Sequence, residues 1–95
     1  MKSIIPDDDE YCYLCKKVGR FVGGSDRHHM IFGTANRKLS DEDGLTVSLC
    51  HTHHMLLHQQ GFYKRELQNL AQKTWQDHFR KTKEEFIARY GRSYL

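Results

Sequence analysis

Three cysteines and seven histidines are the residues of this 95-residue chain whose types and spacing could do chemistry. All three cysteines belong to one pattern, in which Cys12-x2-Cys15 and Cys50-x2-His53 form two pairs with two residues between the partners. This spacing turns the chain back on itself, so both side chains of a pair can reach one tetrahedral Zn²⁺. Four protein ligands leave no open coordination position. The pattern therefore predicts a structural zinc site.

Four further histidines form a second group. His28 and His29 are adjacent, and His54 and His58 are four residues apart. Residues four apart share one face of a helix, so His54 and His58 can present imidazole nitrogens to one ion. Neighbouring residues of a strand point to opposite faces, so one of His28 and His29 completes this set and the other can move a proton. Such an open site can polarise a phosphate oxygen while the remaining histidine activates water.

Two segments carry a family resemblance. RHHMIFG at 27–33 and LCHTHHMLLH at 49–58 resemble an HNH endonuclease of the ββα-metal (His-Me finger) superfamily, in the form with a zinc knuckle. The stretch RHHMIFGTANRKLSDEDGL is similar to small HNH proteins of bacteriophages and prophages. The resemblance implies an α+β fold, in which a zinc-stapled β-hairpin and a short helix form the ββα-metal module and a helical extension follows.

The resemblance also implies a role for each histidine of the second group. His29 is the expected general base and His28 a metal ligand, because the base follows the ligand in the first motif. His54 and His58 are expected to complete the ligand set of a catalytic divalent ion, which could be Mg²⁺, Mn²⁺, Ni²⁺ or Zn²⁺. The expected reaction is hydrolysis of phosphodiester bonds in DNA, with a 3′-hydroxyl and a 5′-phosphate as products. RNA contains the same phosphodiester bond and is the alternative substrate.

The chain departs from the family at one position. Many HNH nucleases carry an asparagine before the second strand that orients the base, and this chain has Leu45 there. Asn36 or a backbone carbonyl is the alternative candidate for orienting the base. Arg27, Arg37 and Lys38 are the expected contacts to phosphate, because arginine offers a planar fork of donors and lysine a mobile charge.

The predicted elements would bring these residues together. Leu45, Val47 and Leu49 alternate with polar residues, which predicts a strand over 45–49 with one buried face, paired with a strand over 27–31. The connection between the strands has the composition of a loop, with one helical turn at 38–43.

Two helices are expected after the strands. Thr52 is the predicted N-cap of a short helix over 52–60, which Gly61 ends. Apolar residues at steps of three and four predict a helix over 63–90, and a polar break at 81–83 can divide it.

Length and charge suggest one domain with three parts. Residues 1–10 are expected to be a flexible acidic lead-in, 11–61 the zinc-containing HNH module, and 62–95 a helical extension that packs on it. The formal charge is +3 overall and +4 over residues 62–95, a balance that permits a nucleic-acid partner.

The same composition indicates a cellular setting. No apolar run approaches the roughly 20 residues that cross a bilayer, and the start lacks the apolar core of a signal peptide. Clustered cysteines act as metal ligands in a reducing compartment. We therefore expect a cytoplasmic protein without a membrane partner, which a larger phage or recombination assembly could recruit.

Two other function classes compete with a nuclease. A non-catalytic zinc module would bind nucleic acid or a protein partner, bind one zinc ion tightly and cleave nothing. A zinc-dependent hydrolase of small substrates fits an open three-histidine site, but the chain lacks the carboxylate base of motifs such as HExxH.

Overall fold

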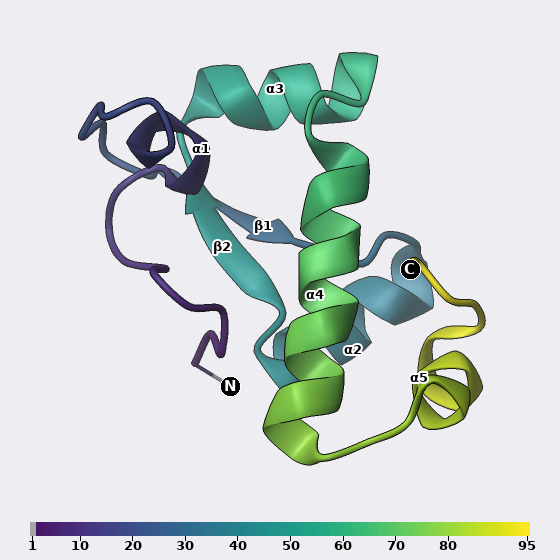
Figure 1. Cartoon of the computed structure of the whole chain (residues 1–95). Coiled ribbons are helices and arrows are strands. Elements are labelled where there is room, and N and C mark those ends of the chain that lie inside the picture. Colours follow the sequence, from purple (N-terminus) through teal and green to yellow (C-terminus); the bar gives the residue numbers. More distant parts are fainter. Residues whose placement is uncertain (1) are drawn as a thin grey trace.

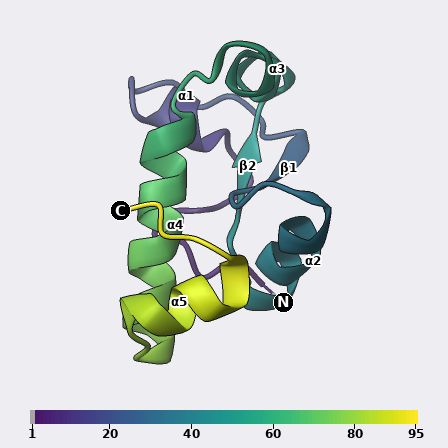
Figure 2. The ribbon, with the colours of Figure 1, turned by 90° about the vertical axis from the view of Figure 1, so that its right-hand side faces the viewer.

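A two-stranded antiparallel sheet lies at the centre of a small α+β fold (Figure 1). The computed structural model describes residues 2–95. Strand β1 (Asp26–His29) pairs with β2 (Thr46–Leu49), and His28 lies opposite Val47. Five helices accompany the sheet in the described residues: α1 (Tyr13–Lys16), α2 (Thr34–Asp43), α3 (His51–Gln60), α4 (Lys64–Phe79) and α5 (Lys83–Tyr90). Helix α3 crosses one end of the sheet and α4 runs alongside it (Figures 1 and 2).

The connection between the strands contains a complete helix, α2, where the sequence pattern predicted a loop with one helical turn. Helix α2 begins after Gly33 and ends at Gly44, which adopts the left-handed conformation with a φ of 74°. The hydroxyl of Ser40 is 3.3 Å from both the backbone nitrogen and the carbonyl oxygen of Ile31, so it attaches the helix to the end of β1. This tertiary contact outweighs the loop composition of the segment.

The other helices follow the predicted pattern with small differences. Helix α3 ends at Gly61 as expected, but its N-cap is Cys50 rather than Thr52. The long C-terminal helix divides near the predicted polar break, where Arg80 ends α4 in the left-handed conformation and Thr82 starts α5 with a capping box. No helix in residues 2–95 combines the length and apolar character needed to cross a bilayer.

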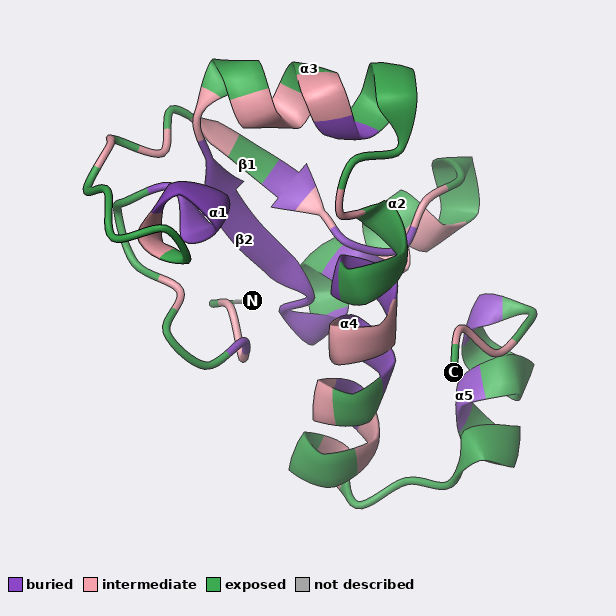
Figure 3. Cartoon of the chain, turned by 45° about the horizontal axis from the view of Figure 1, so that its top comes forward, coloured by how far each residue is buried: buried purple, intermediate pink, exposed green. Residues whose placement is uncertain are grey.

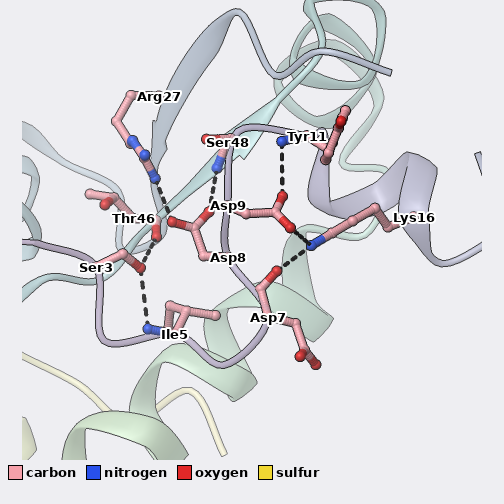
Figure 4. Close-up of polar contacts among 10 residues, drawn as sticks. All are labelled: Ser3, Ile5, Asp7, Asp8, Asp9, Tyr11, Lys16, Arg27, Thr46 and Ser48. Atoms are coloured by element: carbon pink, nitrogen blue, oxygen red, sulfur yellow. Dashed lines mark hydrogen bonds and ion pairs between the residues drawn. The ribbon is translucent and has the colours of Figure 1, made fainter. Parts of the chain in front are cut away.

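Strand β2 is buried on both faces, where one buried face was expected (Figure 3). Val47 is fully buried, and Thr46 and Ser48 on the opposite face are 4% and 5% exposed. Ser3 Oγ donates to the carbonyl oxygen of Thr46 at 2.6 Å, and the N–H of Ser48 donates to Asp8 Oδ1 at 2.9 Å (Figure 4). The acidic segment expected as a flexible lead-in therefore lies along the free edge of β2 and satisfies its backbone groups.

The carboxylate of Asp43, at the end of α2, joins helices α4 and α5 to the rest of the fold. It accepts hydrogen bonds from Trp75 Nε1 at 2.8 Å, from two nitrogens of Arg89 at 2.6 and 2.9 Å, and from the Tyr90 hydroxyl at 2.6 Å. Burial and the bond to Asp43 raise the pKa of Tyr90, so the phenol stays protonated and donates. Trp75 and Tyr90 also pack on the ring of Phe86, with centroid distances of 5.3 and 4.6 Å.

Replacement of Asp43 by alanine should lower the free energy of unfolding by about 3–5 kcal/mol, because it leaves the Trp75 N–H and the Arg89 guanidinium without their shared acceptor. The neighbouring Glu42 also faces Arg89, at 3.9 Å, but its side chain is 51% exposed. Glu42→Ala should therefore cost no more than about 1 kcal/mol. Urea denaturation of both variants measures the difference, and equal losses would contradict the role given to Asp43.

Candidate metal centres

The four predicted zinc ligands converge beside the start of α3. Cys12 precedes α1 and Cys15 lies within it, while Cys50 is the N-cap of α3 and His53 lies in its first turn. Cys15 Sγ is 3.8 Å from Cys50 Sγ, and His53 Nδ1 is 3.3 to 3.4 Å from the three sulfurs. Ligands at ordinary zinc bond lengths form a tetrahedron with edges of about 3.8 Å between sulfurs and about 3.5 Å between sulfur and nitrogen. The four residues are thus placed to bind a metal ion, and their geometry is compatible with structural zinc.

The electrostatics of this cluster also favour a cation. Burial opposes ionisation of Cys12, but hydrogen bonds from the backbone of Cys50 and Cys15 and from His53 outweigh it and lower the pKa of the thiol to about 7. Burial and the neighbouring thiols raise the pKa of Cys15 to about 12. Three sulfurs at this separation cannot all ionise without positive charge between them, and a bound metal ion supplies that charge.

His28, His54 and His58 form the second cluster, in which His28 is the one of the two adjacent histidines that the family resemblance selected. Their ligand nitrogens lie within 4.8 Å of one another, and the Nε2 atoms of His54 and His58 are 3.1 Å apart. His28 comes from β1 and is 1% exposed, and neither of its ring nitrogens has a hydrogen-bond partner among residues 2–95. A buried polar group without a partner is costly, and an ion beside the ring would satisfy it. This donor set fits a divalent metal ion.

The charge state of His28 suits the same role. Burial and the nearby His54, His58 and His29 lower the pKa of His28 to about 3. The ring is therefore neutral at pH 7 and keeps a lone pair for a ligand bond. Burial and the neighbouring His54 likewise lower the pKa of His58.

Asp26, a residue that the sequence pattern did not single out, orients this cluster. Its Oδ2 is 2.9 Å from Nδ1 of His54 and 3.2 Å from Nδ1 of His51, and these hydrogen bonds lower the pKa of Asp26. A proton on Nδ1 of His54 faces this carboxylate and leaves the lone pair on Nε2, the atom next to His58. Asp26 lies two residues before His28 and therefore on the same face of β1, which is the sequence signal that could have identified it.

The histidine cluster lines an open pocket with a volume of about 510 Å³. The predicted base His29 and two of the predicted phosphate contacts, Arg27 and Arg37, line the same pocket. The third, Lys38, is exposed on α2 and is not part of the lining. Arg27 also pairs with Asp8 at 3.0 Å, so the N-terminal segment reaches the edge of the pocket.

The surroundings of His29 differ from the expected arrangement. Asn36 donates its side-chain N–H to the carbonyl oxygen of Tyr90 at 3.1 Å and so contacts the end of α5. The carboxylate beside His29 belongs to Asp41, whose Oδ1 lies 3.5 Å from Nε2 of the ring. Asp41 reaches this place because α2 packs against β1, a contact that no local motif encodes.

Replacement of His53 by alanine should remove the bound zinc, because it opens the tetrahedral site, and should lower the melting temperature. His51→Ala is the matched control, since His51 is two residues away on the same helix, 74% exposed at its side chain and outside the cysteine cluster. Zinc content per chain, measured by mass spectrometry or a colorimetric chelator after purification, distinguishes the two variants. Full zinc content in His53→Ala would contradict the predicted ligand set.

Comparison with known proteins leaves the family undetermined. No protein-family model, no curated protein and no solved structure matches this chain. The resemblance of the segments at 27–33 and 49–58 to HNH nucleases therefore remains a prediction. Independently of it, His28 and His29 of the first segment and His54 and His58 of the second line one pocket.

Proposed function

We propose that this protein is a metal-dependent endonuclease of the HNH type that hydrolyses phosphodiester bonds in DNA. One observation carries the proposal: the buried His28, whose ring nitrogens have no hydrogen-bond partner among residues 2–95, meets His54 and His58 in a pocket that His29 also lines. The two paired strands and the helix α3 that follows them support these histidines as a ββα-metal module would, with the additional helix α2 inserted between the strands. The cysteine cluster, at the start of the same α3, supports a separate and structural role for zinc.

The pocket separates two chemical roles. His28, His54 and His58 would hold a divalent ion, which when bound supplies positive charge to a phosphate oxygen and to the leaving oxygen. Asp26 keeps Nδ1 of His54 protonated, so that the Nε2 atom of that ring is available as a ligand. His28 stays neutral because burial, together with the neighbouring histidines, lowers its pKa to about 3.

His29 is the proton acceptor in this proposal. Its Nε2 faces the carboxylate of Asp41 at 3.5 Å, so a ring proton is favoured on that atom and the lone pair remains on Nδ1. An imidazole with a free lone pair can act as a general base toward water. Asp41 is thus the candidate positioning residue for the base, the role that the absent asparagine has in many HNH nucleases.

Two arginines are placed to contact the phosphate groups of the substrate. Arg37 lines the pocket from α2, and no carboxylate of residues 2–95 forms an ion pair with it. Arg27 lines the pocket from β1, and a phosphate would compete there with Asp8. Guanidinium groups bind phosphate in a bidentate manner, which orients the diester before its hydrolysis.

Replacement of His29 by alanine should reduce cleavage of supercoiled plasmid by at least about 100-fold, the range typical for loss of a general base. Zinc content and melting temperature should stay unchanged, because His29 belongs to neither metal cluster. Cleavage is followed on agarose gels with Mg²⁺, Mn²⁺, Ni²⁺ and Zn²⁺ in turn. His78→Ala, an exposed histidine on α4, is the matched control and should cleave like the wild type.

Full activity of the His29→Ala variant would exclude His29 as the base. Absence of cleavage by the wild type with all four metals, together with one tightly bound zinc ion per chain, would instead favour a non-catalytic zinc module.

A further inference from the structure

A second pocket lies where α3 passes into α4, and basic side chains dominate it. Its lining comes from the α3–α4 turn, the first turns of α4, the C-terminal segment and Phe32 in the connection from β1 to α2. The members that matter here are Phe32, Lys64, Arg65, Gln68, Arg92 and Tyr94. No aspartate or glutamate side chain lines this pocket. We call Lys64, Arg65 and Arg92 the basic triad.

The charges of the basic triad are not neutralised within the described part of the chain. Several other basic side chains of residues 2–95 form ion pairs, including Lys16 with Asp9 and Lys81 with Glu85. None of the triad cations lies within ion-pair distance of a carboxylate of these residues. Three unpaired cations around one concave surface attract an anion, and their mutual repulsion falls when one binds.

Phe32 connects this pocket to the histidine pocket, because its side chain lines both. The Phe32 ring stacks on His58 with a centroid distance of 5.1 Å, and Lys64 Nζ lies 5.0 Å from the centroid of the same ring. Lys64 is thus no further than about 10 Å from the ring of His58. A nucleic-acid strand carries one phosphate per nucleotide, at a rise of about 3.4 Å along the helix axis, so a strand bound at the histidine pocket can bring a neighbouring phosphate to Lys64.

The C-terminal segment that carries Arg92 is attached firmly to α4. Figure 2 shows this segment returning from α5 to α4. Gln72, which is fully buried on α4, accepts a hydrogen bond from the backbone N–H of Tyr94 at 2.6 Å and donates to Ser93 Oγ at 3.2 Å. The guanidinium of Arg92 lies 5.1 Å from the centroid of the Tyr94 ring. The hydrogen bonds of Ser93 and Tyr94 to α4 therefore hold the neighbouring Arg92 at the edge of this pocket.

We propose that the basic triad binds the sugar–phosphate backbone of the nucleic acid, on one side of the phosphate that occupies the histidine pocket. This inference rests on the proposed function and extends it, since it assigns the C-terminal helices a part in holding the substrate strand. Contacts from lysine and arginine to phosphate carry no information about base sequence. Binding by the triad is thus independent of base sequence.

The test compares two triple variants with the same change in charge. Lys64→Ala/Arg65→Ala/Arg92→Ala removes the triad, and Arg20→Ala/Lys73→Ala/Lys83→Ala removes three exposed cations that line neither pocket. Both are made in a His29→Ala background to prevent cleavage. Binding of a fluorescent 20-base-pair DNA is measured by anisotropy at several salt concentrations, without added divalent metal. Circular dichroism melting verifies that both variants fold.

Loss of the triad should weaken binding at least about 10-fold near physiological salt and reduce the slope of log K against log salt by about 3, one unit for each phosphate contact. The control variant should change affinity less than about 2-fold. Equal weakening by both variants, or no weakening by the triad variant, would overturn the inference.

A second measurement separates this inference from the proposed function. With His29 restored, Arg65→Ala/Arg92→Ala should hydrolyse bis(p-nitrophenyl) phosphate at the wild-type rate, because this small diester fills only the histidine pocket and neither arginine lines it, while plasmid cleavage at low enzyme concentration should fall at least about 10-fold. If the wild type cleaves neither substrate but DNA binding still depends on the triad, the proposed activity fails and the binding surface stands. If the rates of hydrolysis of both substrates fall by the same factor, the triad acts on the catalytic pocket itself and the inference fails.

Discussion

The tetrahedral Cys₃His cluster is the constraint on which the rest of the structure depends. It joins the chain near α1 to the junction between β2 and α3, two regions that are 34 residues apart between Cys15 and Cys50. Metal binding in small zinc modules is equivalent to about 10–16 kcal/mol of folding free energy, more than a core of this size supplies alone. His53 and His54 are neighbours, so the same first turn of α3 that completes the cysteine cluster also directs His54 toward β1. The position of one candidate centre therefore determines the position of the other.

The buried strand pair provides the second half of that arrangement. The pleat of β1 directs Asp26 and His28 toward α3, and β2 holds this register because the N-terminal segment satisfies the backbone groups on its free edge. A shift of one residue in this pairing would move His28 away from the histidine cluster and bring His29 in its place. Burial of β2 on both faces makes such a shift costly, and this rigidity is what a metal site with three histidines from two elements requires.

Local spacing predicted the parts of the candidate sites whose geometry is local. A two-residue gap brings two ligands to one side of a metal, and a four-residue gap places two histidines on one helix face, wherever these segments lie in the fold. The Cys₃His cluster and the pairing of His54 with His58 were therefore predictable from residue types and intervals, whereas the choice of His28 over His29 as the third ligand came from the family resemblance. Alternation and capping also act over a few residues. They made predictable the two strands, the end of α3 at Gly61 and the division of the C-terminal helix near 81–83.

Contacts between distant segments were not predictable in this way. The sequence by itself determined which side chains have the chemistry to bind a metal ion or accept a proton, because imidazole and thiolate chemistry and short intervals are properties of the chain. Only the tertiary structure decided that Asp26 orients His54, that Asp41 rather than Asn36 stands beside His29, and that the basic triad borders the histidine pocket. Each of these contacts depends on how α2, α3 and the C-terminal segment pack on the sheet. Such packing is the summed result of many weak, nondirectional interactions, which leave no short pattern in the sequence.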